Sequence, residues 1–198
     1  QIYGAGELSY LEDIIKNEFF ENNTLNTSKF EKLKETDFLE KIANQYNQSI
    51  NTFKSQENFV TDKAPLNFRY IGIIKLIFPN SKVIHCSRSP KDNCLSLYKN
   101  FFDENLNFSY DQDDLSKFYK QYNDLMIFWN KNIPQFIHNV KYEDLISDSK
   151  LEIKNLLNFC GLNWEQNCLE FYKNKRAIKT VSSAQVRKFF YNSSVDSY

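Results

Sequence analysis

The sequence predicts an α/β fold in which a parallel sheet is flanked by helices. Short apolar runs typical of buried strands alternate with longer segments of helical periodicity, and strands that alternate with helices favour parallel pairing. The chain has 198 residues, of which 41% are hydrophobic and 16% aromatic. This length and composition suit one domain with a sizeable core.

The first half of the chain contains two predicted helical regions around a short strand. Residues Phe30 to Phe53 carry apolar side chains at helical spacing, which predicts one long or two shorter amphipathic helices. A strand is expected over Asn58 to Thr61. The helix predicted from Asn67 to Phe78 should end there, because Pro79 cannot continue it.

A strand followed by a capped helix is the clearest local signal. The apolar run from Val83 to Cys86 predicts a buried strand, and a helix is expected from Ser89 to Phe101. Ser89 is a favourable N-cap, Pro90 fits the first helical position, and Asp92 completes a capping box.

The second half of the chain predicts two further helices and a third strand. The first helix spans Asp114 to Asn130, with a stripe of apolar and aromatic residues expected to cover the core. A strand is expected over Phe136 to Tyr142, and a helix from Ser147 to Phe159 that Gly161 ends. The acidic stretch from Asp103 to Asp114 predicts an exposed loop.

Arg88 is placed by this pattern at the carboxyl end of a strand and beside a helix N-terminus. Ligands of open α/β sheets gather at the carboxyl ends of the strands. A guanidinium near a helix N-terminus suits a phosphate or sulfate group. Ser96 lies two helical turns further on and offers a hydroxyl. These residues therefore predict an anion-binding site.

These residues also resemble a known family. An arginine followed by a proline two residues on, an aspartate four on and a serine eight on resembles the 3'-phosphate-binding element of sulfotransferases that use 3'-phosphoadenosine 5'-phosphosulfate. Four further segments fall in the order found in the bacterial sulfotransferases that are often joined to tetratricopeptide repeats, which are relatives of tyrosylprotein sulfotransferases. They are Asp62-Lys63-Ala64-Pro65 with its following residues to Pro79, Val140 to Leu145, Phe159 to Leu162, and Thr180 to Arg187.

The resemblance implies a fold, an activity and a donor. The fold would be similar to that of P-loop nucleotide hydrolases, but without its first strand and phosphate loop, since the four glycines form no such loop. The chain would then be a single sulfotransferase domain, residues 1–198, incomplete at both ends. The implied reaction is sulfuryl transfer from 3'-phosphoadenosine 5'-phosphosulfate to a hydroxyl, phenol or amine, with weak or no activity in this chain alone. No metal is implied.

Three catalytic candidates follow from the resemblance. Lys63 would stabilise charge on the sulfuryl oxygens, although an ordinary exposed lysine is the alternative. Ser182 would lie near those oxygens, or else belong to a plain serine-rich loop. Glu7 follows a glycine-rich turn over Gly4 to Gly6 and would act as the general base if burial raised its pKa. Alternatively, Glu7 orders the loop, because relatives carry a second glutamate where this chain has Leu8.

Four residues are candidates for binding the nucleotide. Arg88 and Ser96 would bind the 3'-phosphate. Tyr142 would line the adenine or 3'-phosphate side, with core packing as the alternative. Arg187 is a weaker phosphate candidate. His85 and His138 are expected to be structural, since both fall within predicted strands.

Charge and cysteine content limit the partners. With 25 basic and 25 acidic residues the formal net charge is zero, so no global field draws in nucleic acid or a membrane. The cysteines Cys86, Cys94, Cys160 and Cys168 have apolar neighbours and predict free, buried thiols in a reducing compartment. Together with the resemblance to bacterial enzymes, this leads us to expect the cytoplasm of a bacterium, which a shortened N-terminus does not decide. The acceptor could be a peptide, a carbohydrate or a small molecule, and the oligomeric state is left open.

Two alternative functions fit the sequence. In the first, Arg88 and Ser96 bind a nucleotide without any transfer. In the second, the basic segment from Lys173 to Lys188, which contains no acidic residue, binds polyanions as an interaction module. The chain begins with Gln1 and its single methionine is Met126. We therefore expect that it does not begin at a native translation start.

Overall fold

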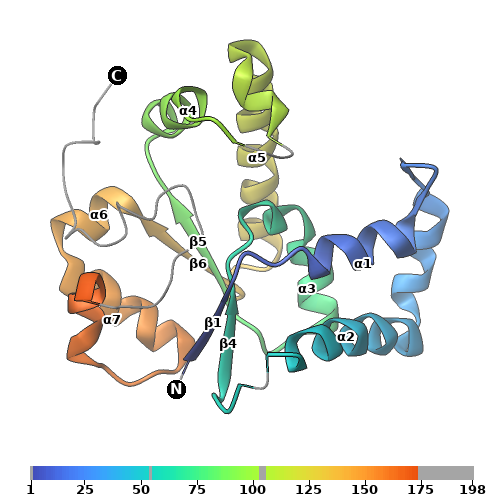
Figure 1. Ribbon diagram of the computed structural model, residues 1–198, viewed down its shortest axis with the longest axis horizontal. Coiled ribbons are helices and arrows are strands. Elements are labelled where there is room, and N and C mark those ends of the chain that lie inside the picture. The colour runs from blue at the N-terminus through green and yellow to red at the C-terminus, as the bar shows by residue number, and fades with distance from the viewer. Residues whose placement is uncertain (1, 54, 103–105, 174–198) are drawn as a thin grey trace. The chain divides into compact units, whose positions relative to one another are not determined.

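The computed structural model describes residues 2–53, 55–102 and 106–173. The chain divides into two compact units, residues 1–81 and 82–198. Each unit contains a pair of parallel strands with helices packed beside it (Figure 1). The prediction of an α/β fold with parallel strands is confirmed.

The described residues of the first unit form four strands and five helical segments. Its strands are β1 (Ile2–Gly6), β2 (Phe20–Glu21), β3 (Thr24–Leu25) and β4 (Phe59–Asp62). Its helices are α1 (Tyr10–Phe19), α2 (Thr36–Asn51) and α3 (Ile71–Ile77), with 3₁₀ segments η1 (Thr27–Lys34) and η2 (Pro65–Tyr70). The region predicted as one or two helices is therefore two segments, η1 and α2.

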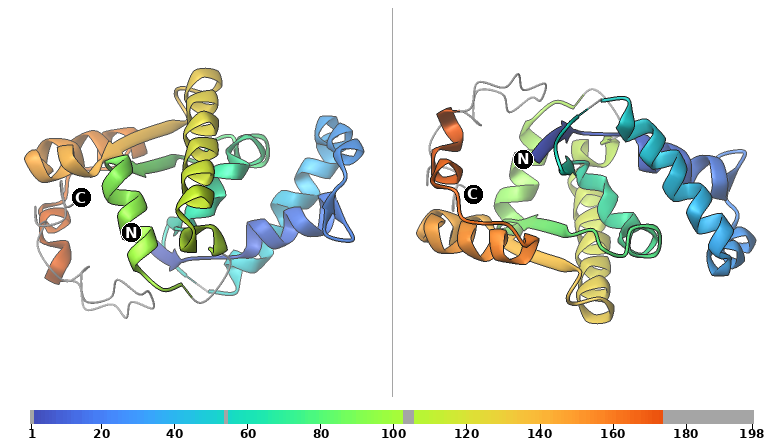
Figure 2. Two further views of the ribbon diagram at one scale, coloured as in Figure 1. Left: turned by 90° about the horizontal axis from the view of Figure 1, so that it is seen from above. Right: turned by 90° about the horizontal axis from the view of Figure 1, so that it is seen from below.

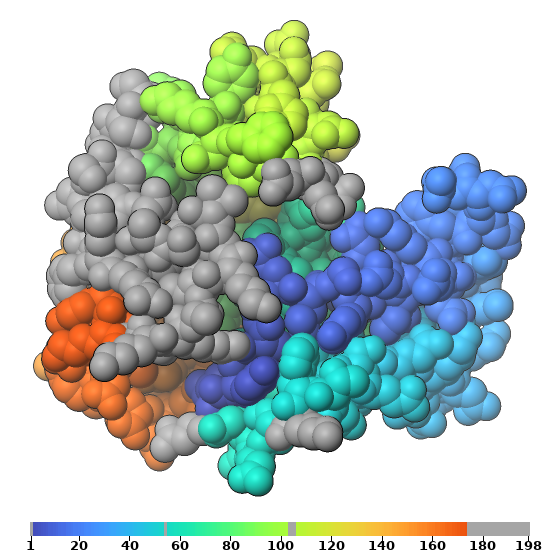
Figure 3. Space-filling view, viewed as in Figure 1, coloured from blue at the N-terminus to red at the C-terminus, as the bar shows by residue number. Residues whose placement is uncertain are grey.

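The core of the first unit lies between α1, α2 and α3. Leu11, Ile15 and Phe19 repeat every four residues along α1 and form one buried stripe. They pack with Phe38 and Ile42 of α2 and with Ile77, which ends α3. Figure 3 shows the surfaces of α1 (blue) and α2 (cyan) in contact.

The glycine-rich segment near the start of the chain is a strand for most of its length. The sequence predicted a turn over Gly4 to Gly6, whereas β1 pairs with β4 through Gly4 and reaches Gly6, after a register irregularity between these two glycines. The chain turns only at Gly6, whose φ of +89° lies in the region that favours glycine. Glu7 therefore follows directly from the end of a parallel strand.

The second unit holds two strands and six helical segments within its described residues. The strands are β5 (Val83–Ser87) and β6 (Ile137–Lys141), paired in parallel from Val83↔Ile137 to Ser87↔Lys141. The helices are α4 (Pro90–Lys99), α5 (Gln112–Asn132), α6 (Tyr142–Ser147) and α7 (Ser149–Cys160), with 3₁₀ segments η3 (Asn107–Tyr110) and η4 (Gln166–Lys173). Figure 2 shows α7 beside β6.

Several local predictions of the second unit are confirmed. Pro90 occupies the first turn of α4, with Ser89 as the N-cap residue. The stripe of α5 is buried or half-buried, with Leu115 and Met126 buried. Helix α7 ends at Gly161, which has a φ of +68° and is followed by the Leu162 amide donating to the Leu157 carbonyl at 2.9 Å.

Four local predictions are wrong. The strand from Val83 to Cys86 was predicted to be buried, but Ile84 and Cys86 are exposed and the rest of β5 is half-buried. The hydroxyl of Ser89 makes no capping hydrogen bond. The acidic stretch is not all loop, because Asp111 accepts the amides of Asp113 and Asp114 and so caps the N-terminus of α5. The cysteines are free but not buried: Cys86 is exposed and the other three are half-buried.

Candidate active site

Two of the predicted catalytic residues, Glu7 and Lys63, contact each other in the first unit. Each follows the end of a parallel strand: Glu7 follows β1 and Lys63 follows β4. The Lys63 amide donates to the Gly6 carbonyl at 2.7 Å, and its ammonium forms an ion pair with the Glu7 carboxylate. The parallel pairing of β1 with β4 thus brings a cation and a carboxylate together at the C-terminal ends of these two strands.

Both side chains of this pair are accessible. Their exposed fractions are 59% for Lys63 and 51% for Glu7. Even so, the surrounding protein partly desolvates the ammonium and lowers the pKa of Lys63. The burial that the hypothesis of Glu7 as a general base assumed is not present, since half of that side chain is open to solvent.

Asp62 is part of the sequence motif that contains Lys63, but no role was assigned to it. In the structure it links the end of β4 to the segments around it. Its carboxylate accepts the Leu8 amide at 3.3 Å and the Tyr46 hydroxyl at 2.9 Å. Burial raises the pKa of Asp62, although the hydrogen bonds from Tyr46, Leu8 and Asn67 oppose that rise. Burial and the neighbouring Asp62 carboxylate also raise the pKa of Tyr46.

The predicted anion site lies at the end of β5 in the second unit. Arg88 follows β5 directly, and its side chain is 22% exposed. The centre of its guanidinium lies 5.8 Å from the ring of Tyr142, the first residue of α6. One predicted nucleotide-binding residue is therefore placed against another.

A buried carboxylate sits one helical turn from Arg88. Asp92 of α4 is 1% exposed, and its Oδ1 lies 3.8 Å from Nη2 of Arg88. This separation allows electrostatic attraction but exceeds a hydrogen bond. Ser96 lies one more turn along α4, so it shares a helix face with Asp92, while Arg88 precedes the helix. The arrangement fixes the arginine against α4 and the ring of Tyr142.

The N-terminus of α4 already binds a carboxylate of the chain itself. The amide of Ser89 donates to Oε1 of Glu143 at 2.8 Å. A capping box would give that amide to Asp92, and Glu143 takes it because β6 runs beside β5 and delivers the start of α6 to this point. An oxyanion is stable here, beside the positive end of the helix dipole.

The two histidines have structural surroundings. His85 bridges β5 and its neighbours, with Nδ1 2.7 Å from Oδ1 of Asn139 and Nε2 2.5 Å from the hydroxyl of Tyr122. The ring of His138 stacks on Phe159 at 5.1 Å. Nδ1 of His85 is thus engaged with β6, and Nε2 is engaged with α5.

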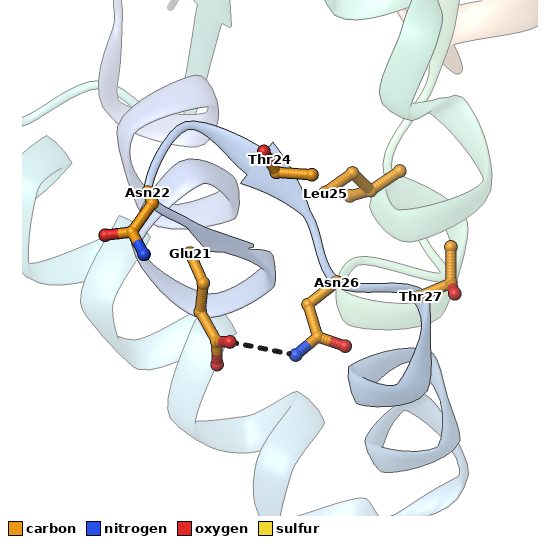
Figure 4. A pocket seen from close by; sticks show the side chains of 6 residues that line it. All are labelled: Glu21, Asn22, Thr24, Leu25, Asn26 and Thr27. Carbon is orange, nitrogen blue, oxygen red and sulfur yellow. Dashed lines mark hydrogen bonds between the residues drawn. The ribbon is translucent and has the colours of Figure 1, made fainter.

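Two cavities lie away from these residues. One, of about 440 Å³, is formed by the β2–β3 hairpin, where Asn26 and Lys29 hold the Glu21 carboxylate (Figure 4). The other, of about 480 Å³, lies between α4 and α5 and is lined by Pro90, Lys91, Cys94, Leu95, Tyr98, Gln112, Leu115, Ser116 and Tyr119. It faces the side of α4 that does not carry Asp92 and Ser96.

Some predicted residues lie outside the described part of the chain. These are Ser182 and Arg187, together with most of the basic segment from Lys173 to Lys188. Lys173 is described and pairs with Glu170 at 2.8 Å. Among the described residues, no cluster of three or more histidine, cysteine or acidic side chains could hold a metal ion. Within the same residues, no helix combines the length and apolarity needed to cross a bilayer.

Sequence reasoning missed Tyr46, Glu143 and the role of Asp62. Tyr46 lies within the region from Phe30 to Phe53 that was predicted to be amphipathic, and its ring packs near Phe78 at 5.4 Å between centroids. Nothing in the spacing showed that its hydroxyl would reach residue 62. Glu143 and Asp62 each stand beside a residue that was singled out, Tyr142 and Lys63, and this adjacency was the available signal.

The fold is that of an α/β protein in which a cation follows the end of a parallel strand in each unit. The model of the sulfotransferase family matches residues 8–166, so the chain belongs to the sulfotransferase family.

Two other proteins are similar to this chain. An uncharacterized protein of Aquifex aeolicus (strain VF5) is 36% identical over 163 residues, which is 81% of this chain and 21% of that protein. The chain thus spans about a fifth of that relative's length. The sulfotransferase domain from the curacin biosynthetic pathway has a similar fold, with a TM-score of 0.53 and 19% identity over 91% of this chain and 66% of that one.

Proposed function

We propose that this chain takes part in sulfuryl transfer from 3'-phosphoadenosine 5'-phosphosulfate to an acceptor hydroxyl, phenol or amine. The observation that carries the proposal is the position of Arg88, largely buried at the carboxyl end of a parallel strand and beside the N-terminus of α4. Membership of the sulfotransferase family supports the reaction class.

The residues at the end of β5 fit a phosphate ester. Arg88 offers a charged fork of donors, and the Tyr142 ring lies against it. The Ser89 amide already donates to the carboxylate of Glu143, which supports a preference of this helix end for an oxyanion. In the proposal, Arg88 and Ser96 hold the 3'-phosphate and Tyr142 lines the same side, while Ser182 and Arg187 keep the roles that the resemblance implies.

Lys63 and Glu7 take the catalytic roles in the proposal. The donor, when bound, supplies a sulfuryl group and a nucleotide phosphate as the leaving group. The Lys63 ammonium neutralises charge that develops on oxygen, an effect that is strongest where water is excluded. Glu7 first pairs with Lys63 and then accepts the proton of the acceptor group. No metal is required by this scheme, and a peptide, a carbohydrate or a small molecule remains open as the acceptor.

Calorimetric titration with adenosine 3',5'-bisphosphate tests the phosphate assignment. Arg88→Ala should lower the affinity by about tenfold to a hundredfold, because a charge-assisted hydrogen bond contributes roughly 1.5–3 kcal/mol. Lys91→Ala is the matched control, since it removes an exposed cation three residues along on another face of α4 and should leave the affinity unchanged. Equal affinities of wild type and Arg88→Ala would refute the assignment.

A further inference from the structure

The carboxylate of Asp62 is the point where three segments of the first unit meet. Oδ1 accepts the amide of Leu8, which lies just after the Gly6 turn. Oδ2 accepts the hydroxyl of Tyr46, which projects from α2. A further hydrogen bond comes from the side chain of Asn67 in η2. Asp62 itself ends β4, so one side chain ties the strand to its neighbours.

Both proposed catalytic side chains are next to these anchors in the sequence. Glu7 precedes Leu8, and Lys63 follows Asp62. The backbone hydrogen bond from Lys63 to Gly6 then joins the two segments directly at 2.7 Å. Glu7 and Lys63 are exposed and flexible side chains, so their alignment depends on how firmly the backbone beneath them is held.

We propose that Asp62, together with Tyr46, is a positioning residue that holds Lys63 and the Glu7 turn in the geometry that sulfuryl transfer requires. This inference rests on the proposed function. Its physical basis is that a displacement of about 1 Å in a charged group near the reacting atoms can cost about a hundredfold in rate. A half-buried carboxylate with donors from three segments restricts such displacement.

Two variants separate positioning from plain stability. Tyr46→Phe removes one hydroxyl and leaves the ring that packs near Phe78. Asp62→Asn keeps the shape of the side chain but removes its charge. Tyr70→Phe is the matched control, because Tyr70 is also a half-buried tyrosine that packs against the core of the first unit.

The first measurement is an NMR titration of the lysine side chains, with the Lys63 signal assigned by Lys63→Arg. In the wild type, partial desolvation lowers the pKa of Lys63. If Asp62 and Tyr46 position this residue, Tyr46→Phe, which changes no formal charge, should move the pKa of Lys63 up toward the ordinary value of about 10.4, whereas Tyr70→Phe should not. A general loss of stability would leave the pKa of Lys63 in the folded protein unchanged.

The second measurement compares the affinities for 3'-phosphoadenosine 5'-phosphosulfate and for adenosine 3',5'-bisphosphate. The ratio reports contacts with the sulfuryl group alone. Tyr46→Phe, Asp62→Asn and Lys63→Ala should each reduce the preference for the sulfated nucleotide by about tenfold and leave the affinity for the bisphosphate intact.

The two measurements fail in different ways. If the wild type binds neither nucleotide, the proposed function is wrong, and the NMR titration still decides whether Asp62 and Tyr46 position Lys63. An unchanged pKa of Lys63 in folded Tyr46→Phe overturns the positioning role. If Asp62→Asn does not fold, the pKa of Lys63 in Tyr46→Phe alone decides whether the positioning role is correct.

Discussion

The ends of β4 and β5 place the same kinds of groups in opposite surroundings. Each strand is followed by a cation, with a carboxylate nearby. At the end of β4, Lys63 is 59% exposed and pairs with an exposed glutamate. At the end of β5, Arg88 is 22% exposed and faces Asp92, whose side chain is inaccessible to solvent. The first cation is free to change partners during a reaction, while the second is fixed as part of the fold.

This difference matches two kinds of task. A group that stabilises a transient charge must be able to exchange a resting partner for the substrate, which an exposed ion pair allows at little cost in free energy. A group that recognises a permanent phosphate benefits from a fixed orientation before binding. The contrast therefore supports chemistry at Lys63 and recognition at Arg88.

The largest expected effect concerns the free energy of unfolding when the buried carboxylate beside Arg88 is removed. Asp92→Ala should lower the free energy of unfolding by about 3 kcal/mol, because it leaves the charge of Arg88 largely buried without its nearest carboxylate. Urea denaturation at neutral pH measures this. Asp144→Ala, at an exposed position on α6, should change stability by less than about 0.5 kcal/mol. If Asp92→Ala and Asp144→Ala lower the free energy of unfolding equally, Asp92 does not hold the Arg88 side chain in place.

A smaller effect compares the two glycines with positive φ. An added Cβ would meet no atom within 4 Å at either Gly6 or Gly161, so only backbone strain remains. Alanine should therefore cost about 1 kcal/mol at each position. Thermal denaturation measures the loss, and Gly161→Asn should recover part of it because asparagine tolerates the left-handed region.

The two glycine variants should differ in function. Gly6→Ala disturbs the turn before Glu7 and should also weaken the preference for the sulfated nucleotide, whereas Gly161→Ala, at the end of α7, should leave nucleotide binding intact. Equal effects of the two variants on binding would contradict a specific role of the Gly6 turn in placing Glu7.

The smallest effect is a pH dependence confined to the end of β4. The folded-state pKa of Asp62 is raised by burial, so the folded state holds its proton to a higher pH than the unfolded state. As pH rises from the ordinary aspartate value of about 3.9 through the raised pKa of Asp62, the wild type should lose stability relative to Asp62→Asn. Denaturation of both proteins across this window measures the difference.

A matched control for this pH dependence is Asp37→Asn on the exposed start of α2. It removes a carboxyl group from the same unit without touching Asp62, and it should leave the fall in stability in place. A pH dependence that persists in Asp62→Asn would show that another group is responsible.

Local patterns predicted much of the fold because they reflect local physics. Pro90 cannot lie deep in a helix and so marked the start of α4, and Gly161 adopts a φ of +68° that other residues avoid, so it marked the end of α7. The spacing of apolar residues predicted α2 and α5, because the helical period is also a property of residues close in the chain. Gly4 was misjudged, because a glycine favours a turn only where no neighbouring strand pairs with it, and β4 pairs with it here.

The sequence by itself determined where Arg88 and Lys63 would stand, each after a strand, since strand and helix boundaries depend on residues that are close in the chain. Only the tertiary structure decided which groups meet them. Tyr46 reaches Asp62 across 16 residues and Glu143 reaches Ser89 across 54. Such contacts depend on how helices pack and on the register of β5 with β6, and no local spacing encodes those choices.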